Sequence, residues 1–431
     1  MSQTISEKIL SRVVGRTVTA GDIVFPEPEL IVVHDWYAAN AGSLLDEFGV
    51  TSLHAPEKVM FVTDHEPLAV SPEAATRQAR VREIVRRFRV GHFFDVGRGG
   101  HGHVFPVEKG FVRPGMYVAA YDTHVPNYGA VGALGIALLT EIVEVLALGS
   151  VWIKVPETVR VNLSGRLSPW VSVRDFAQRL IGDLDPETVD YSVVEYGGPG
   201  LANLPFDARF TLCNTPLEIG AKSALVEPDL ATARYLHARG VATSDMPRSD
   251  AGAAYKQIVQ YTLDDVTPQI ALPPLPENVV PIAQVVGTPV HHAFVGSCAS
   301  GLLADLRTAA QVLRERRIDR NVRMFITPAT TEILEQAARE GLIDIFAKAG
   351  AIVTAPGCGP CAGGRIGPLA EGENSINTGT RNDYGRLGPS KANIYLASPA
   401  SVAAAAVTGR IVDPRELMAG TDHGDEREAL P

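Results

Sequence analysis

The four cysteines are the residues of this sequence with the most distinctive chemistry. Cys298 lies in GSCASG, Cys358 and Cys361 form a C-x-x-C in PGCGPCAGG, and Cys213 stands apart, ahead of Asn214. Four cysteines in 431 residues cannot form a disulfide framework, so metal binding or redox chemistry is favoured. Three thiolates suit an iron–sulfur cluster with one open iron, while spacing alone leaves a zinc site, redox thiols and inert buried cysteines as alternatives.

Histidines and carboxylates form a second chemical group. Asp64-His65 follows VMFVT, and Asp122-Thr123-His124 follows MYVAAY. A carboxylate that stabilises imidazolium would make His65 a general acid, whereas the alternative is a loop histidine with ordinary hydrogen bonds. The run GRGGHGH, which carries His101 and His103, is either a close-approach loop or a glycine turn with exposed imidazoles.

Two arginines and one glutamate complete the candidates. Arg381 and Arg386 lie five residues apart in TRNDYGR, a spacing that suits either a clamp for a small dicarboxylate or a solvated loop. Glu218 interrupts an apolar, helix-like run in CNTPLEIGAK, where an isolated acid marks a helix boundary or a functional group.

Most of these motifs come directly after strand-like runs. The strands are predicted over 59–63, 116–121, 292–296 and 352–355, and they alternate with helical segments in an α/β arrangement. Open α/β sheets bind ligands at the carboxyl ends of their strands, so the four motifs are expected to converge on one cleft. The amides of the helix predicted over 302–316 are expected to lower the pKa of the Cys298 thiol.

Further helices are predicted over 331–340 and 399–407, and near the N-terminus, where Thr4 and Glu7 are spaced as a capping box. The most apolar long stretch, 128–149, contains Glu141, Glu144 and four glycines. We therefore interpret it as a buried helix rather than a membrane span. No signal peptide is recognisable, and we expect a cytoplasmic protein.

The length and composition indicate about three globular domains. We place them at 1–150, 151–280 and 281–431, with a Pro-rich linker at 271–281 and a polar, frayed tail from Gly420. The chain is 45% hydrophobic and 20% charged, which excludes extensive disorder. Its net charge of -10 argues against binding to nucleic acid or to an anionic membrane.

Together the motifs resemble the aconitase superfamily. AYDTHVPNYGAVGALG, GSCASG and APGCGPC…TGTRNDYGR are similar to its D-S-H-T, G-S-C-T-N and P-G-C-x-x-C…NRNFxGR segments, in the same order. The similarity runs from about Thr4 to Pro414 and is greatest to the large subunits of two-subunit hydro-lyases, such as 3-isopropylmalate dehydratase. The resemblance implies three α/β domains packed around an iron–sulfur cluster, without the separate swivel domain.

The resemblance also implies a role for each candidate residue. Cys298, Cys358 and Cys361 match the ligands of a [4Fe-4S] cluster with one open iron. Asp64 and His65 match the pair that protonates the departing hydroxyl, and His103, and Asp122 with His124, match a second histidine group around that hydroxyl. Glu218 matches a further catalytic residue, near the cluster and its bound water. Residues that match substrate-binding positions are Thr123, Asn214, Arg381 and Arg386.

The expected reaction is the dehydration and rehydration of a malate-type 2-hydroxy dicarboxylate, with 3-isopropylmalate as the first candidate substrate. Dimethylmalate, citramalate or maleate-type acids, homoaconitate and citrate are alternatives, as is a non-catalytic iron-sensing or RNA-binding role. Because no segment matches the swivel domain, which holds the serine base in the family, the chain is expected to need a small subunit. Departures from the family motifs put the substrate in doubt rather than the reaction: they are His101, Thr123, Ala299-Ser300 and Thr380.

Overall fold

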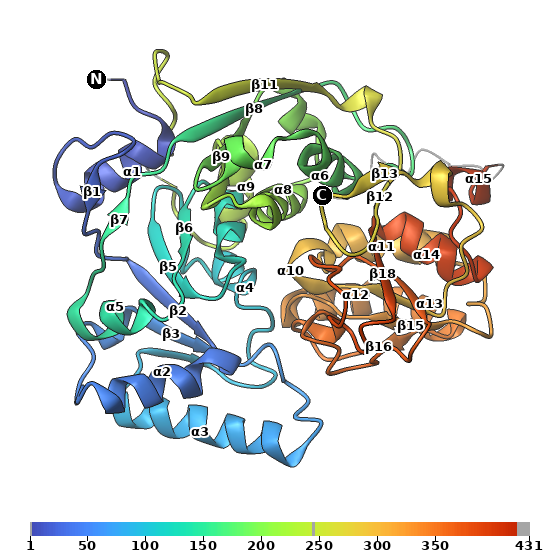
Figure 1. Cartoon of the computed structure of the whole chain (residues 1–431), viewed down its shortest axis with the longest axis horizontal. Coiled ribbons are helices and arrows are strands. Elements are labelled where there is room, and N and C mark those ends of the chain that lie inside the picture. The colour runs from blue at the N-terminus through green and yellow to red at the C-terminus, as the bar shows by residue number, and fades with distance from the viewer. Residues whose placement is uncertain (1, 244–245, 420–431) are drawn as a thin grey trace.

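The computed structural model describes residues 2–243 and 246–419, and the polar tail predicted from Gly420 lies outside them. Three parallel or mostly parallel sheets, each covered by helices, make up the molecule (Figure 1). The α/β class predicted from the sequence is therefore confirmed. No helix in the described ranges is both long enough and apolar enough to cross a bilayer.

The first sheet contains five parallel strands in the order β4-β3-β2-β5-β6. These are β2 (Leu30–His34), β3 (Val59–Val62), β4 (His92–Phe94), β5 (Tyr117–Tyr121) and β6 (Leu134–Ala137). Alternate side chains enter two buried clusters, so that Val33 and Phe61 face one cluster while Val32 and Met60 face the other. Burial of both faces explains the continuous apolar runs in the sequence. The helices of this region are α1 (Ile5–Val14), α2 (Asp35–Glu47), α3 (Pro72–Phe88), α4 (Phe105–Glu108) and α5 (Ile142–Leu148).

The second sheet has four parallel strands in the order β10-β9-β8-β11. They are β8 (Thr158–Ser164), β9 (Val193–Gly197), β10 (Ser223–Val226) and β11 (Gln257–Thr262). Its helices are α6 (Val173–Asp183), α7 (Pro186–Val189), α8 (Ala208–Asn214) and α9 (Leu230–His237), and the 3₁₀ turn η4 (Thr215–Ile219) continues α8. A short antiparallel ribbon pairs β1 (Ile23–Val24), which precedes the first sheet in sequence, with β7 (Ile153–Lys154), which lies between the first and second sheets.

The third sheet has seven strands in the order β13-β12-β18-β17-β14-β15-β16, of which the last five are parallel. They are β12 (Gln269–Ala271), β13 (Val279–Pro281), β14 (His292–Val295), β15 (Arg323–Ile326), β16 (Ile352–Val353), β17 (Asn374–Asn377) and β18 (Asn393–Ala397). The helices around it are α10 (Ser297–Ser300), α11 (Leu303–Leu313), α12 (Thr331–Arg339), α13 (Leu342–Ala349), α14 (Pro399–Thr408) and α15 (Pro414–Leu417).

The first and third sheets share a doubly wound strand order. From β2 the chain adds β3 and β4 on one side and then β5 and β6 on the other, and from β14 it does the same with β15 and β16, then β17 and β18. Ligands in such sheets bind where the order reverses, at the carboxyl ends of the strands. The two reversal points lie close together, since the amide of Cys358 donates to the carbonyl of Asp64 at 2.9 Å and the amide of His101 donates to that of Ala329 at 2.7 Å.

Glycine makes one of these contacts possible. Gly100 has φ +100°, and a Cβ there would lie 2.6 Å from the Cα of Thr330, with which Gly100 forms an isolated β-bridge. The glycine run is therefore a close-approach loop that joins the first sheet to the third, and its two histidines are buried rather than exposed.

Most of the predicted elements are found within one to three residues of their expected ends. The N-terminal helix starts at Ile5 with the Thr4–Glu7 capping box formed in both directions. The predicted helices over 302–316, 331–340 and 399–407 correspond to α11, α12 and α14.

The interpretation of 128–149 as one buried helix is wrong. This stretch forms the end of a 3₁₀ turn (Val125–Val131), then β6 and then α5. Gly132 adopts φ +76°, which ends the turn, and a Cβ on Gly135 would lie 2.3 Å from the carbonyl oxygen of Val125. The glycines thus permit a sharp reversal and a tight strand contact, and the apolar composition reflects burial instead of helix formation.

The segment 271–281, predicted to be a linker, instead forms most of a β-hairpin. Strand β12 pairs with β13 on one side and with β18 on the other, so the hairpin is part of the third sheet. The prolines lie in its turn and at its edge strand, where no ladder amide is required. The boundaries at 150 and 280 stay predictions.

A polar cavity of about 150 Å³ lies where helices of all three regions meet. Its lining includes Glu108 of α4, Tyr235 and Arg239 in and after α9, Arg307 of α11 and Glu332 of α12. Burial and the nearby Glu332 raise the pKa of Glu108 to about 8. Its Oε1 accepts a hydrogen bond from the hydroxyl of Thr330 at 3.0 Å, so the buried carboxyl links α4 of the first region to the start of α12 in the third.

The substitution Glu108→Gln is expected to flatten the pH dependence of stability. Between about pH 4.3, where an unfolded glutamate titrates, and about pH 8, the folded protein holds a proton that the unfolded chain releases, so the free energy of unfolding falls as pH rises. Glutamine keeps the acceptor for Thr330 and removes the ionisation. Thermal unfolding measured across this range should show a higher Tm for the variant at the alkaline end, whereas the exposed Glu47→Gln control should follow the wild type. An unchanged slope in the Glu108 variant would contradict the prediction.

Candidate active site

Three of the four cysteines gather at the reversal point of the third sheet. Cys298 lies in the short helix α10 directly after β14, and Cys358 and Cys361 lie in and beside the 3₁₀ turn that follows β16. The thiols are close enough that Cys358 and Cys361, in addition to burial, raise the pKa of Cys298 well above its usual value. The expectation that the amides of the helix predicted over 302–316, which is α11, lower this pKa is wrong, because burial and the two neighbouring cysteines raise it.

Cys213 lies apart from this group. It is fully buried among the apolar side chains of the second sheet. Burial raises the pKa of its thiol, which is the behaviour of an inert core cysteine.

His65 is surrounded by carboxylates. Its Nδ1 lies 2.8 Å from Oδ1 of Asp64 and 3.2 Å from Oδ1 of Asp35, and its Nε2 lies 3.2 Å from Oδ2 of Asp122. Burial alone would lower the pKa of His65, but Cys358 and these carboxylates together raise it well above its usual value. The ring is therefore an imidazolium at neutral pH, with a proton on each nitrogen.

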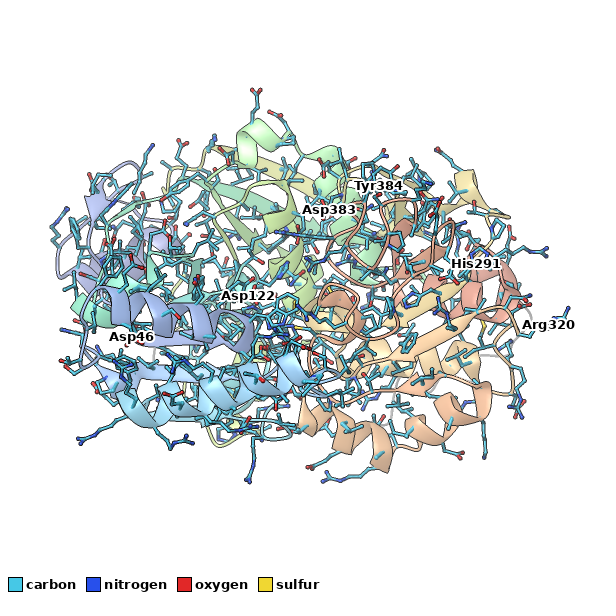
Figure 2. The ribbon with its side chains drawn as sticks, turned by 60° about the horizontal axis from the view of Figure 1, so that its bottom comes forward. Asp46, Asp122, His291, Arg320, Asp383 and Tyr384 are labelled. Atoms are coloured by element: carbon cyan, nitrogen blue, oxygen red, sulfur yellow. The ribbon has the colours of Figure 1, made fainter. Side chains whose placement is uncertain are left out.

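The two central carboxylates are held ionised by histidines. Burial opposes ionisation of Asp64, yet His34 and His65 lower its pKa well below the usual range. Burial also opposes ionisation of Asp122, yet His103 and His65 lower its pKa well below the usual range. Figure 2 shows Asp122 in the middle of the molecule, whereas Asp46 and Arg320 lie near opposite ends.

His103 differs from His65 in its charge state. It is completely buried, and burial together with His34 lowers its pKa to about 4, so the ring is neutral. Its Nε2 lies 3.4 Å from Oδ2 of Asp122, but neither ring nitrogen makes a hydrogen bond of good geometry with another described residue. A charged and a neutral imidazole thus lie near the same carboxylate oxygen, Oδ2 of Asp122, an arrangement suited to proton transfer.

A second chain of charged groups reaches the site from η4. His124 Nε2 lies 2.7 Å from Oε1 of Glu218, and Oε2 of Glu218 accepts from Nε of Arg381 at 2.9 Å. Burial opposes ionisation of Glu218, but His124 and Arg381 lower its pKa. Thr123 is held beside them, because its hydroxyl donates to Asp122 at 3.2 Å and lies 3.3 Å from Nδ1 of His124.

Asn214 links the second sheet to the thiols. Its amide nitrogen donates to Cys298 Sγ at 3.2 Å and to Oδ1 of Asn127 at 2.9 Å, which leaves its own Oδ1 buried without a described partner. Asn127 in turn donates to the carbonyl of Cys298 at 2.9 Å. Arg386, on the loop that also carries Arg381, has a buried Nε that lacks a partner among the described residues.

Several residues of this site were not predicted from the sequence, among them His34, Arg174, Asp35 and Asn127. His34 ends the central strand β2 and donates from Nδ1 to Asp64 at 2.9 Å, with its Nε2 unpartnered among the described side chains. Arg174 of α6 is buried and donates to the carbonyl of Gly379 at 2.6 Å, and Cys361 and Cys298 are near enough to influence its pKa. In LIVVHD, as in VMFVTDH, an apolar strand is followed directly by polar residues, so this pattern could have identified His34. Nothing in the sequence marked Arg174.

The residues present fit an iron–sulfur cluster. The buried thiols of Cys298 and Cys358 have raised pKa values and would stay neutral unless a cation drew off their protons, as metal binding does. The unpartnered polar atoms of His103, Asn214 and Arg386 are the kind of groups that a polar ligand beside the thiols would satisfy. Three thiols, rather than four, leave one metal position without a protein sulfur ligand.

The points where the strand order reverses in the first and third sheets lie close together, and they bring thiols, imidazoles and carboxylates into one site. This site defines the class of the protein as an α/β enzyme that uses metal-assisted acid–base chemistry. The aconitase family (aconitate hydratase) matches residues 8–291 and 282–409 of this sequence. The chain therefore belongs to the aconitase family, as the resemblance of its motifs predicted. Membership of this family implies an iron–sulfur cluster.

Individual relatives are similar to this chain over nearly its full length. The 3-isopropylmalate dehydratase large subunit 1 of Methanopyrus kandleri is 37% identical over 97% of this chain and 100% of its own length. The 3-isopropylmalate dehydratase large subunit of Thermodesulfovibrio yellowstonii is 38% identical with the same coverage. Among solved structures, the aconitase X of Thermococcus kodakaraensis in its holo-form matches at a TM-score of 0.49 and 11% identity, over 83% of this chain and 84% of that chain.

Proposed function

We propose that this chain is the catalytic large subunit of a cytoplasmic [4Fe-4S] hydro-lyase that dehydrates and rehydrates a malate-type 2-hydroxy dicarboxylate. The observation that carries the proposal is the gathering of three thiols beside the charged His65, from two sheets whose reversal points meet. The names of the relatives favour 3-isopropylmalate as the substrate and a small subunit as the partner.

In this proposal Cys298, Cys358 and Cys361 hold the cluster. When bound, the cluster supplies an electrophilic iron that draws electron density from the hydroxyl and carboxylate oxygens of the substrate. The elimination also requires protonation of the hydroxyl, which is a poor leaving group, and acidic side chains of the protein supply this proton.

His65 is the proton donor for the departing hydroxyl. Its Nδ1–H is directed to Asp64 and Asp35, which fixes the ring, while the Nε2 proton is shared with Asp122 at 3.2 Å. After donation, the neutral His103, whose Nε2 lies 3.4 Å from the same oxygen of Asp122, is placed to take part in returning a proton. The carboxylates of Asp64 and Asp35 hold Nδ1 of His65, so this ring keeps its orientation when its charge changes.

The charged groups around Arg381 bind and orient the dicarboxylate. One nitrogen of Arg381 is committed to Glu218, and the guanidinium retains further N–H groups for a substrate carboxylate. Arg386 lies on the same loop with a buried, unpartnered Nε, and the Thr123 hydroxyl and Asn214 amide oxygen add neutral contacts. Of these groups, the guanidinium N–H donors of Arg381 and Arg386 stabilise the negative charge that develops on the substrate carboxylate as its neighbouring C–H is broken.

The chain alone is expected to be nearly inactive. The relatives are named large subunits, which supports a small-subunit partner that completes the site, and a general base contributes roughly 10²–10⁴-fold to rate. Anaerobically loaded protein should therefore gain about 100-fold or more in hydro-lyase turnover when the organism's small subunit of this enzyme type is added. Ultraviolet absorbance of the unsaturated product measures the rate.

Each result of this experiment has a definite meaning. Robust turnover by the loaded chain alone would reject the need for a partner. An iron- and sulfide-loaded chain that turns over no malate-type acid with the small subunit present would reject the hydro-lyase proposal. Rates on 3-isopropylmalate compared with dimethylmalate, citramalate, homoaconitate and citrate identify the substrate.

A further inference from the structure

His101 is a buried histidine that the proposed reaction does not use. It is 3% exposed and lies in the glycine loop that joins the first sheet to the third. Its own amide donates to Ala329 at 2.7 Å, and the adjacent Gly100 is bridged to Thr330. The backbone of His101 is thus hydrogen-bonded to the region of the third sheet, which carries the thiols.

The hydrogen bonds of its ring assign the position of the ring proton. Nε2 of His101 lies 3.2 Å from Sγ of Cys358, and Nδ1 accepts the backbone N–H of His103 at 3.3 Å. A nitrogen that accepts carries no proton, so the proton of the neutral ring is on Nε2, the nitrogen that faces the sulfur.

The nearby carboxylate of Asp64 does not compete for that proton. Its Oδ2 lies 3.3 Å from Nδ1 of His101 without the geometry of a hydrogen bond. The same oxygen already accepts from Gly102 N at 2.8 Å and from Nδ1 of His34 at 2.9 Å. Asp64 is satisfied by other donors, which leaves Nδ1 to the His103 amide and Nε2 to the sulfur.

We propose that His101 is a positioning residue that donates an N–H···S hydrogen bond to Cys358 and thereby raises the reduction potential of the cluster that this cysteine holds. The inference rests on the proposed function, since it requires the cluster. A hydrogen bond to a ligating sulfur withdraws electron density from it and stabilises the form of the cluster that carries one more electron. An aliphatic side chain at this position would leave the sulfur without this donor.

An anaerobic redox titration with dithionite, monitored by electron paramagnetic resonance of the reduced cluster, tests the proposal. Three variants are compared with the wild type: His101→Leu removes the donor, His101→Gln retains an N–H group, and His237→Gln alters an exposed histidine of α9 as the control. The midpoint potential is expected to shift downward in the leucine variant and by a smaller amount in the glutamine variant. It should be unchanged in the control.

Iron and acid-labile sulfide are measured first, which separates the two proposals. A wild-type chain without a cluster would overturn the proposed function itself. A loaded leucine variant with the wild-type potential would overturn the role of His101 alone. If the leucine variant fails to load while the glutamine variant loads, the donated hydrogen bond is supported, whereas failure of both variants would assign His101 a purely steric role and reject the inference.

Discussion

Replacement of any one of Cys298, Cys358 and Cys361 by serine is expected to lower iron and sulfide content together and to abolish hydro-lyase turnover. Loss even of a residue that only supports a metal ligand costs about 10–100-fold in metal affinity, and loss of the ligand itself should cost at least that much. Serine preserves the size of the side chain but binds iron poorly because its hydroxyl is neither soft nor acidic. Colorimetric iron and sulfide analysis of anaerobically purified protein measures the effect.

Cys213→Ser is the matched control for these three variants. Its thiol lies in the apolar cluster of the second sheet, so its loss should leave the cluster content unchanged, although stability can fall slightly. A Cys213 variant that loses iron as completely as the other three, while still folded by circular dichroism, would contradict the assignment. Zinc at unit stoichiometry without sulfide in the wild type would also contradict it.

Replacement of His65 by glutamine is expected to lower kcat by roughly 10²–10⁴-fold while the cluster is retained. Glutamine keeps a hydrogen-bonding group near Asp64 but has no proton to give. Because the effect falls on the chemical step, KM should change far less than kcat. Steady-state kinetics in the presence of the small subunit, with iron content measured on the same samples, checks this result.

The pH profile gives an independent check on His65. Its pKa is raised well above the usual value of about 6.5, so the acid form persists as the pH rises through that value. The wild-type kcat should accordingly show no fall near pH 6.5, where an unperturbed imidazole loses its proton. A His237→Gln control should match the wild type, and a wild-type profile that falls near pH 6.5 would argue against His65 as the acid.

The convergence of the strand-end motifs was predictable because it follows from sheet geometry. Buried parallel strands are recognisable as short apolar runs, and the polar residues after Val62, Tyr121 and Val295 are necessarily at the carboxyl edges of their sheets. That edge of each sheet is where the structure brings Asp64, Asp122 and Cys298.

What could not be predicted depends on packing between distant segments. The pKa of Cys298 is set by burial and by two cysteines about 60 residues away, which outweigh the local helix that the sequence indicates. Arg174 reaches the site through a single contact with Gly379 from another sheet. The stretch 128–149 has the composition of a buried helix, but tertiary contacts at its glycines decide otherwise. In each case non-local contacts override a local preference.

All three proposed cluster ligands come from one sheet, while the acids around His65 come from another. Because the chain is synthesised from its N-terminus, the sheet that carries Asp64, His65 and Asp122 can fold before the first of the three cysteines has left the ribosome. Sequence position thus allows the sheet that carries the acids to be complete before the proposed cluster ligands are synthesised. Inherited or engineered lesions in the first sheet should appear as defects of cofactor acquisition as well as of turnover.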